Sequence, residues 1–316
     1  MIGQQSRTAG TSREARRGAA DDRSDLGDAK AGRCRHAPAH CGAMDARLQR
    51  RVQRYGWDLA STEYDPLWEE QLAPARTAML AAASLAPPES VLDLACGTGL
   101  VTLNAARSVG PRGTVLGTDL SGQMIEVARQ RVLEQQLPNV TFQRMDAETL
   151  DLPSATFDVV LCALGLMYLP DPQRALTEWL RVLKPGGRVA IAVWGKRVNC
   201  GWSPVFPIVD AEVDTDVCPL FFSLGEPDAL AQLATDSGFQ NVQQRRIATV
   251  LSYVDADEAC DAAFVGGPVA LAWSRFDAQT RARARARYKH AIEPWRRSEG
   301  YRIPGEFVIV AGRRPR

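Results

Sequence analysis

The 316-residue sequence lacks long apolar runs, a strong excess of either charge, and all but three histidines. No apolar stretch approaches the ~18–20 residues of a membrane-spanning helix, and the N-terminus lacks the apolar core of a secretory signal. Thirty-eight basic against 37 acidic residues leave a net charge of +1, which argues against a globally basic nucleic-acid binder. We therefore expect a cytoplasmic protein with no membrane span.

The number and spacing of the cysteines argue against a disulfide framework. Seven cysteines, an odd number, are spread along a long chain. Cys96 and Cys162 stand in apolar or glycine-rich runs, where a reduced thiol packs well. The segment 34–41 groups two cysteines with two histidines, but the spacing matches no common zinc finger. We predict no metal site.

Residues 1–43 have too little apolar character to form a core. From the set Leu, Ile, Val and Phe they contain only Ile2 and Leu26, together with eight basic and five acidic residues. Such a segment cannot offset the entropy of folding, and its acidic residues argue against a transit peptide. We expect a disordered tail or an over-long start that places the true first residue at Met44.

The rest of the chain divides by pattern into a helical part and an alternating part. Residues 44–87 read as N-terminal helices that end at Pro87 and Pro88. Their aromatic residues, Tyr55, Trp57, Tyr64 and Trp68, fit either a core or a lid over a site. From residue 88 onward, β-rich apolar runs alternate with helical periodicity, which predicts a doubly wound parallel sheet with helices on both faces.

The expected strands are 90–95, 114–118, 140–145, 157–163, 188–194, 242–253 and 307–311. The expected helices are 100–108, 122–135, 171–183 and 226–237, with further helices between 256 and 293. Residues 195–225 contain three prolines and read as an irregular insertion, and a helical insertion spans about 256–300. The stretch Lys184-Pro-Gly-Gly187 predicts a helix stop and a turn.

Two elements of a small-molecule site follow the first two strands. The first strand runs into Gly97-Thr98-Gly99 and then a helix, so bare backbone and unpaired N–H groups face a ligand there. Asp119 ends the second strand, where a carboxylate accepts hydrogen bonds from ribose hydroxyls; the alternative for Asp119 is a helix N-cap, in competition with Ser121. Thr102 stands where a dinucleotide fingerprint needs a third glycine, and the loop lacks the Gly-Lys-Ser/Thr ending of a phosphate loop.

Four stretches in order resemble the class I S-adenosylmethionine-dependent methyltransferases, in the branch that includes ubiquinone/menaquinone-type enzymes. They are 91–99, 117–119, Met145-Asp-Ala-Glu148 and 183–187. The resemblance covers about residues 88–195, with 226–239 also similar. It implies a Rossmann-like, doubly wound α/β fold with a seven-stranded sheet whose last strand is antiparallel, plus a helical acceptor-binding elaboration. It also implies S-adenosyl-L-methionine as cofactor.

The same resemblance assigns cofactor-binding roles residue by residue. It implies that the loop after the first strand holds the methionine part, that the end of the second strand holds the ribose, and that the third and fourth strands lead to the adenine and the sulfonium. Asp146 could instead cap a short helix. The implied cofactor-binding residues are Asp93, Ala95, Gly97, Gly99, Asp119, Leu120, Asp146, Ala147 and Ala163.

The predicted activity is methyl transfer to a small, hydrophobic organic acceptor by direct displacement, with the acceptor atom and any general base unassigned. His290 and Tyr168 are weak candidates for a base. Alternatives are an NAD-dependent oxidoreductase, a non-catalytic cofactor-binding regulator, and an RNA methyltransferase that uses the basic C-terminal region. Residues 281–316 carry a net +8 and residues 44–280 carry −10, yet arginines spaced by two spread around a helix. Nucleic acid is therefore a disfavoured partner, and a homodimer stays open.

Overall fold

The computed structural model describes residues 46–213 and 221–316. The interpretation of residues 1–43 as a tail or over-long start, the start at Met44 and the cysteine and histidine group at 34–41 lie outside the described residues. Within the described ranges, no helix is long and apolar enough to cross a membrane.

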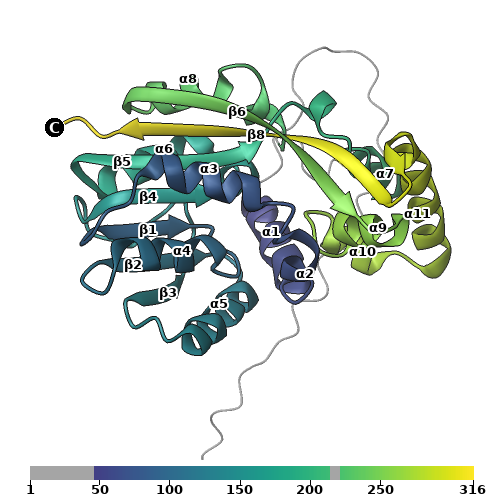
Figure 1. Cartoon of the computed structure of the whole chain (residues 1–316), viewed down its shortest axis with the longest axis horizontal. Coiled ribbons are helices and arrows are strands. Elements are labelled where there is room, and N and C mark those ends of the chain that lie inside the picture. Colours follow the sequence, from purple (N-terminus) through teal and green to yellow (C-terminus); the bar gives the residue numbers. More distant parts are fainter. Residues whose placement is uncertain (1–45, 214–220) are drawn as a thin grey trace, which may run out of the picture. The chain divides into compact units, whose positions relative to one another are not determined.

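A mixed sheet forms the centre of the described part. Its strands are β1 (Ser90–Leu94), β2 (Thr114–Asp119), β3 (Val140–Arg144), β4 (Phe157–Ala163), β5 (Leu183–Trp194), β6 (Gln240–Tyr253), β7 (Arg296–Arg297) and β8 (Gly300–Arg313). Their order is β3-β2-β1-β4-β5-β8-β6, with β7 paired to β8. The pairs among β1 to β5 are parallel, and β8 runs antiparallel to both β5 and β6 (Figure 1). The doubly wound fold with an antiparallel last strand is confirmed.

The strand count differs slightly from the predicted seven. In the described residues the sheet has eight strands, because the two-residue β7 pairs with the beginning of β8. Seven strands form the continuous path, so the additional pairing is a local extension. Strand β8 is longer than the predicted 307–311, since it follows β6 along almost all of that strand as a long antiparallel ribbon.

Helices cover the sheet and extend the chain beyond it. They are α1 (Ala46–Ala60), α2 (Tyr64–Trp68), α3 (Ala73–Ala83), α4 (Leu100–Val109), α5 (Gly122–Gln135), α6 (Pro172–Val182), α7 (Val205–Val213), α8 (Ala229–Asp236), α9 (Ala256–Phe264), α10 (Ala270–Arg275) and α11 (Ala278–Ile292). Helix α3 packs across β4, β5 and β8 and contacts α4, whereas α6 packs on β5 and contacts α8. The α6 stripe is fully buried at Leu176 and Trp179, as its period of 3.6 predicts.

The insertion at 195–225 is less irregular than predicted. It contains helix α7, and Pro207 stands third in that helix. A proline is tolerated in the first turn because the N–H it lacks has no intrahelical acceptor there. The prediction weighed the prolines as breakers and so missed the apolar face of α7, where Phe206 and Val209 are buried.

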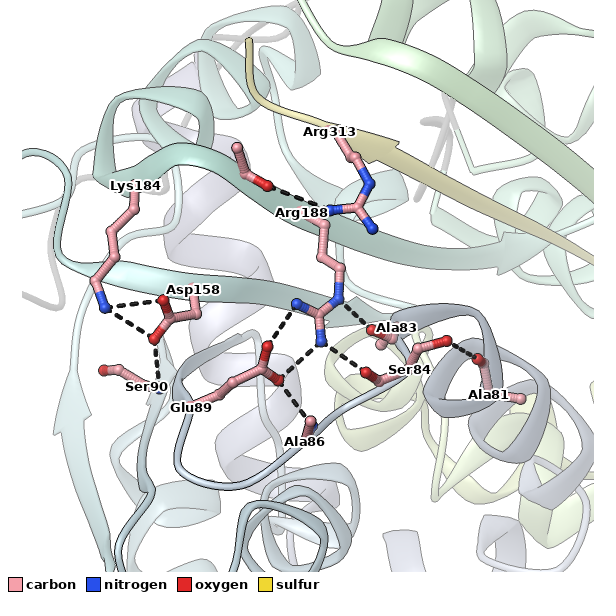
Figure 2. Close-up of polar contacts among 11 residues, drawn as sticks. Ala81, Ala83, Ser84, Ala86, Glu89, Ser90, Asp158, Lys184, Arg188 and Arg313 are labelled. Atoms are coloured by element: carbon pink, nitrogen blue, oxygen red, sulfur yellow. Dashed lines mark hydrogen bonds and ion pairs between the residues drawn. The ribbon is translucent and has the colours of Figure 1, made fainter. Parts of the chain in front are cut away.

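The Lys184-Pro-Gly-Gly187 stretch is structural, as predicted, but it lies within β5 rather than before it. Helix α6 ends at Val182, and Leu183 already pairs with Phe157 before the register shifts. The Lys184 ammonium donates to the two Asp158 oxygens, at 2.9 and 2.8 Å (Figure 2). Burial alone would raise the pKa of Asp158, but the hydrogen bond from Lys184 keeps it below its usual value. The lysine therefore fastens β5 to β4.

A second polar group in the same view secures the beginning of β1. The Arg188 guanidinium binds both Glu89 oxygens, at 2.7 and 2.8 Å, and also donates to the carbonyls of Ala83 and Ser84 (Figure 2). Such a fork gives a charge-assisted pair with fixed geometry. Burial would raise the pKa of Glu89, yet the bond from Arg188 holds it below the usual value. The end of α3 is thereby tied to β5.

Basic residues of α11 have acidic partners on neighbouring helices. Arg283 lies 2.9 Å from Glu212 of α7, and Arg285 lies 2.7 and 2.6 Å from Asp257 and Asp261 of α9. Arg281 donates to the carbonyls at the end of α10. The basic residues at 281–287 therefore connect α11 to the neighbouring helices, and acidic residues of α7 and α9 supply the opposite charge.

The end of β5 is held by a carboxylate from β8. Glu306 accepts hydrogen bonds from Lys196 N at 3.0 Å and from Arg246 at 2.8 Å, and Arg246 also donates to Gly225 O at 2.6 Å. Gly195 packs so closely on Glu306 that an added Cβ would overlap the carboxylate. This contact fixes where the chain leaves the sheet.

We expect Gly195→Ala to lower the free energy of unfolding by about 1–3 kcal/mol, the usual cost of overpacking a tight site. Urea denaturation measures the change. Gly122→Ala is the matched control, because Gly122 begins α5 and an added Cβ there meets no atom of the described chain within 4 Å. Equal stability of the two variants would contradict the prediction.

Candidate cofactor and acceptor site

A pocket opens at the carboxyl ends of β1, β2 and β4, beside the point where the strand order reverses. Open α/β sheets bind ligands at this place. Seven of the nine predicted site residues line it, namely Ala95, Gly97, Asp119, Leu120, Asp146, Ala147 and Ala163. Asp93 and Gly99 lie close in sequence but do not line the pocket.

The loop between β1 and α4 presents bare backbone to the pocket. Gly97 has φ +54, and a Cβ built there would meet no atom of the described chain within 4 Å. Gly99 has φ +85 and instead packs against Ala128 and Phe142, at 3.1 and 3.3 Å from an added Cβ. The two glycines therefore differ in role: Gly97 leaves space for a ligand, and Gly99 allows α5 to approach α4.

Asp119 joins the first two loops. One of its oxygens accepts a hydrogen bond from Gly97 N at 2.9 Å, and the other accepts one from Ser121 N at 2.8 Å. The N-cap of α5 is Ser121, whose hydroxyl accepts from Met124 N. Burial raises the pKa of Asp119, although the backbone hydrogen bonds oppose the shift. Each oxygen keeps a lone pair for a further donor.

Asp93 is buried beneath this loop, with 1% of its surface exposed. Its Oδ2 accepts a hydrogen bond from the Thr102 hydroxyl at 2.6 Å, and its Oδ1 finds no partner among the described residues. Burial raises the pKa of Asp93 to about 7. Thr102, the residue that departs from the dinucleotide fingerprint, is thus the hydrogen-bond donor to this carboxylate.

The turn after β3 carries Asp146, Ala147 and Glu148. Asp146 accepts from Glu148 N at 2.9 Å, and its other oxygen lies 2.9 Å from Nε of Arg50 on α1. Glu148 is fully buried and also binds Arg50, at 2.8 Å from Nε. The Ala147 carbonyl accepts from the indole of Trp179 at 2.9 Å. The turn is therefore held from α1 and from α6.

The N-terminal helices touch each of the three loops that end β1, β2 and β3. Asp65 of α2 accepts from the Thr98 hydroxyl at 2.6 Å. Asp58 of α1 accepts from the Ser121 hydroxyl at 2.6 Å and from Gln123 N at 3.2 Å. Arg50 supplies the third contact, to the turn after β3. Residues 46–68 thus form a wall of the pocket that is tied to every loop beneath it.

Aromatic side chains form a second group of residues that line the pocket. Trp57 meets Tyr64 and Tyr168 edge to face, with ring centroids 5.7 and 5.3 Å apart, and Trp68 meets Trp194 and Trp202 in the same way. Of the four N-terminal aromatic residues, Trp57, Tyr64 and Trp68 reach the pocket. Tyr55 is 45% exposed and carries Arg54 over its ring instead.

Sequence reasoning missed the pocket residues Arg50 and Gln53 of α1, which follow no strand of the motif, so their spacing gave no signal. Trp202 lies in the 195–225 insertion, and Gly266 and Gly267 follow α9; both segments are expected from the sequence to contribute to the acceptor pocket. His290, one weak candidate for a base, is exposed on α11 and does not line the pocket, whereas Tyr168 does.

Comparisons with known proteins place this geometry in a family. Residues 91–187 match a methyltransferase domain family. The chain is 35% identical over 147 residues to aklanonic acid methyltransferase DauC of Streptomyces sp. (strain C5), covering 46% of this chain and 66% of that protein. It is 45% identical over 100 residues to demethylmenaquinone methyltransferase of Lactococcus lactis, covering 32% of this chain and 40% of that protein. The alignments thus span 66% and 40% of these relatives' lengths.

A solved structure supports the fold. One such structure is phosphoethanolamine N-methyltransferase 2 of Haemonchus contortus in complex with S-adenosyl-L-methionine. The alignment covers 87% of this chain and 61% of that chain, at a TM-score of 0.56 and 18% identity. This likeness concerns the fold. With the matched residues 91–187 and the strand order above, the chain carries a methyltransferase domain of the class I S-adenosylmethionine-dependent family.

Proposed function

We propose that this protein binds S-adenosyl-L-methionine in the pocket above β1, β2 and β4 and transfers its methyl group to a small, hydrophobic organic acceptor. The observation that carries the proposal is the Asp119 carboxylate, which lies on the pocket wall beside the open backbone of Gly97. Two oxygens with a free lone pair each suit the paired hydroxyls of a ribose.

The residues present fit this cofactor at its other groups. Leu120, Met145 and Ala147 give an apolar slot for a purine ring, and Asp146 gives an acceptor for its amine. The Oδ1 of Asp93, which is buried behind the pocket lining and unpaired within the described ranges, suits a water that bridges to an ammonium group. The site requires no lysine, because the cofactor carries no phosphate.

When bound, the cofactor supplies a methyl group on an activated sulfonium. The protein's own contribution is alignment, which is worth ~7–11 kcal/mol when two reactants are held in a reactive geometry. The aromatic wall of Trp57, Trp68 and Trp194 excludes water and favours a neighbouring cation. Tyr64 also lines the pocket, but burial raises its pKa, so its hydroxyl stays protonated and acts as a donor rather than a base.

The composition of the pocket lining supports a hydrophobic acceptor. The charged side chains among the described lining residues are Arg50, Asp119 and Asp146, and they lie at the end proposed for ribose and adenine. The remaining lining is uncharged and largely apolar, with six aromatic residues and with apolar side chains such as Met167, Leu169 and Pro268. A charged acceptor would lose its hydration there without gaining a counterion.

The proposal extends to partners and compartment. Cys96, Cys162, Cys200 and Cys260 are free and buried, which suits a reducing compartment such as the cytoplasm. A small organic acceptor is the proposed partner. The homodimer stays a prediction.

We expect Asp119→Ala to weaken binding of S-adenosylhomocysteine by roughly 10–100-fold, because hydrogen bonds to a charged group are each worth about 1.5–3 kcal/mol. Isothermal titration calorimetry measures the affinity. Asp151→Asn is the control, since Asp151 is exposed and loses the same charge. No binding by the unaltered protein, or an unchanged affinity in the Ala variant, would contradict the proposed site.

Asp93 makes stability depend on pH in the protein without cofactor. Its folded pKa of about 7 exceeds the ordinary aspartate value of 3.8, so the folded state keeps a proton that the unfolded chain releases near pH 4. This contribution is complete below pH ~4 and is lost as pH rises through 7. Asp93→Asn keeps an acceptor for Thr102 and removes the titration. Its melting temperature should therefore decline less than the wild-type value between pH 4 and 7; parallel profiles would refute this.

If the protein were an RNA methyltransferase, its affinity for RNA would fall steeply with salt; methyl transfer to a small hydrophobic acceptor requires no RNA binding. RNA binding through 6–10 phosphate contacts loses about 10³–10⁵ in affinity between 50 and 200 mM salt. The arginines of α11 already have partners on α7 and α9, so we expect anisotropy of a labelled RNA to show no saturable binding in 50 mM salt. Saturable binding that falls steeply with salt would favour the RNA alternative.

A further inference from the structure

We propose that Arg50 is a positioning residue for adenine recognition, which acts by holding the Asp146 carboxylate. The inference rests on the proposed function, because it assumes that Asp146 accepts a hydrogen bond from the adenine amine. Arg50 stands on α1, outside the matched methyltransferase residues 91–187. It lines the same pocket as Asp146.

The contacts of Asp146 leave its carboxylate little freedom. One oxygen accepts from Glu148 N at 2.9 Å, and the other lies 2.9 Å from Nε of Arg50. With a backbone donor on one oxygen and the guanidinium paired with the other, the carboxylate is held from two sides. Each oxygen still has a lone pair, so Asp146 can accept a hydrogen bond from a ligand without releasing Arg50.

Glu148 explains why the guanidinium is needed at this place. Its side chain is fully buried, whereas the side chains of Arg50 and Asp146 are 25% and 26% exposed. One Glu148 oxygen binds Arg50, and the other accepts from Asp171 N at the beginning of α6. Two carboxylates in adjoining positions repel each other, and the shared cation offsets that repulsion. The planar fork of arginine can meet both; an ammonium is a compact point charge.

The position of Arg50 is itself fixed by the rest of the N-terminal wall. Asp58 on the same helix binds Ser121 and Gln123, and Asp65 on α2 binds Thr98. Helix α1 is thus held against the loops after β1 and β2 while Arg50 reaches the turn after β3. The selectivity for adenine therefore depends on a segment that precedes the matched domain.

A ligand pair that differs at the adenine amine tests this role. S-adenosylhomocysteine carries the amine, and S-inosylhomocysteine carries a carbonyl oxygen in its place. We expect the unaltered protein to prefer the first by about tenfold or more in calorimetry, as for a hydrogen bond to a charged group. In Arg50→Met the preference should fall to about threefold or less, mainly through weaker binding of S-adenosylhomocysteine.

Two further variants separate positioning from a loss of folding. Arg51→Gln removes the same charge from the next residue of α1, which is exposed, and should keep the full preference. Arg50→Lys keeps a cation beside Glu148, so it remains measurable if Arg50→Met does not fold, and its preference should also fall. Thermal unfolding of each variant reports whether the fold is intact.

The outcomes divide clearly. If Arg50→Met and Arg50→Lys weaken both ligands equally, or keep the wild-type preference, Arg50 is only structural and the inference fails. If the unaltered protein binds both ligands equally well, Asp146 does not recognise the amine, and the inference fails while the proposed cofactor site stands. If it binds neither ligand, the proposed function fails and the inference with it.

Discussion

The hydrogen bonds that Asp119 accepts from Gly97 N and Ser121 N organise the site. Parallel strands deliver their loops to one edge of the sheet, yet two neighbouring loops still need a link to make one surface. The buried carboxylate supplies that link and stays on the pocket wall. Because its pKa is raised by burial, its ionised form depends on these backbone donors. The shape of the β1 loop and the charge of the pocket therefore depend on the same group.

The N-terminal helices α1 and α2 also link the loops of the sheet through polar contacts. Thr98, Ser121 and Asp146 belong to three different loops, and each contacts a polar residue of α1 or α2. A segment held at three points by charge-assisted bonds is a fixed wall, in contrast to a loosely packed cover. The same helices carry Trp57, Tyr64 and Trp68 to the pocket. One segment thus contributes both the ion pair at the proposed adenine site and part of the aromatic lining.

The basic C-terminal region forms ion pairs with acidic residues that precede it in the sequence. The basic run of α11 is balanced by Glu212, Asp257 and Asp261, which lie far from it in sequence. The excess of +8 over residues 281–316 and the deficit of −10 before them are therefore partly the two halves of internal ion pairs. What reads along the sequence as a charged C-terminal region is, in the fold, a contact between helices.

The order of strands and helices can be predicted from the sequence, because periods of 2 and 3.6 and the glycine turns are local signals. Strand β4 and helix α5 have the predicted bounds, and Asp119 stands where a second strand should end. Two wrong predictions also have local causes. Pro207 led to the prediction of an irregular segment where α7 lies, and the glycines after Lys184 led to the prediction of a turn where β5 begins. Only the tertiary structure places Arg50 against Asp146, and only it shows that Gly97 opens to the pocket while Gly99 does not. Such contacts depend on how the helices pack, and the spacing of residues along the chain does not predict that packing.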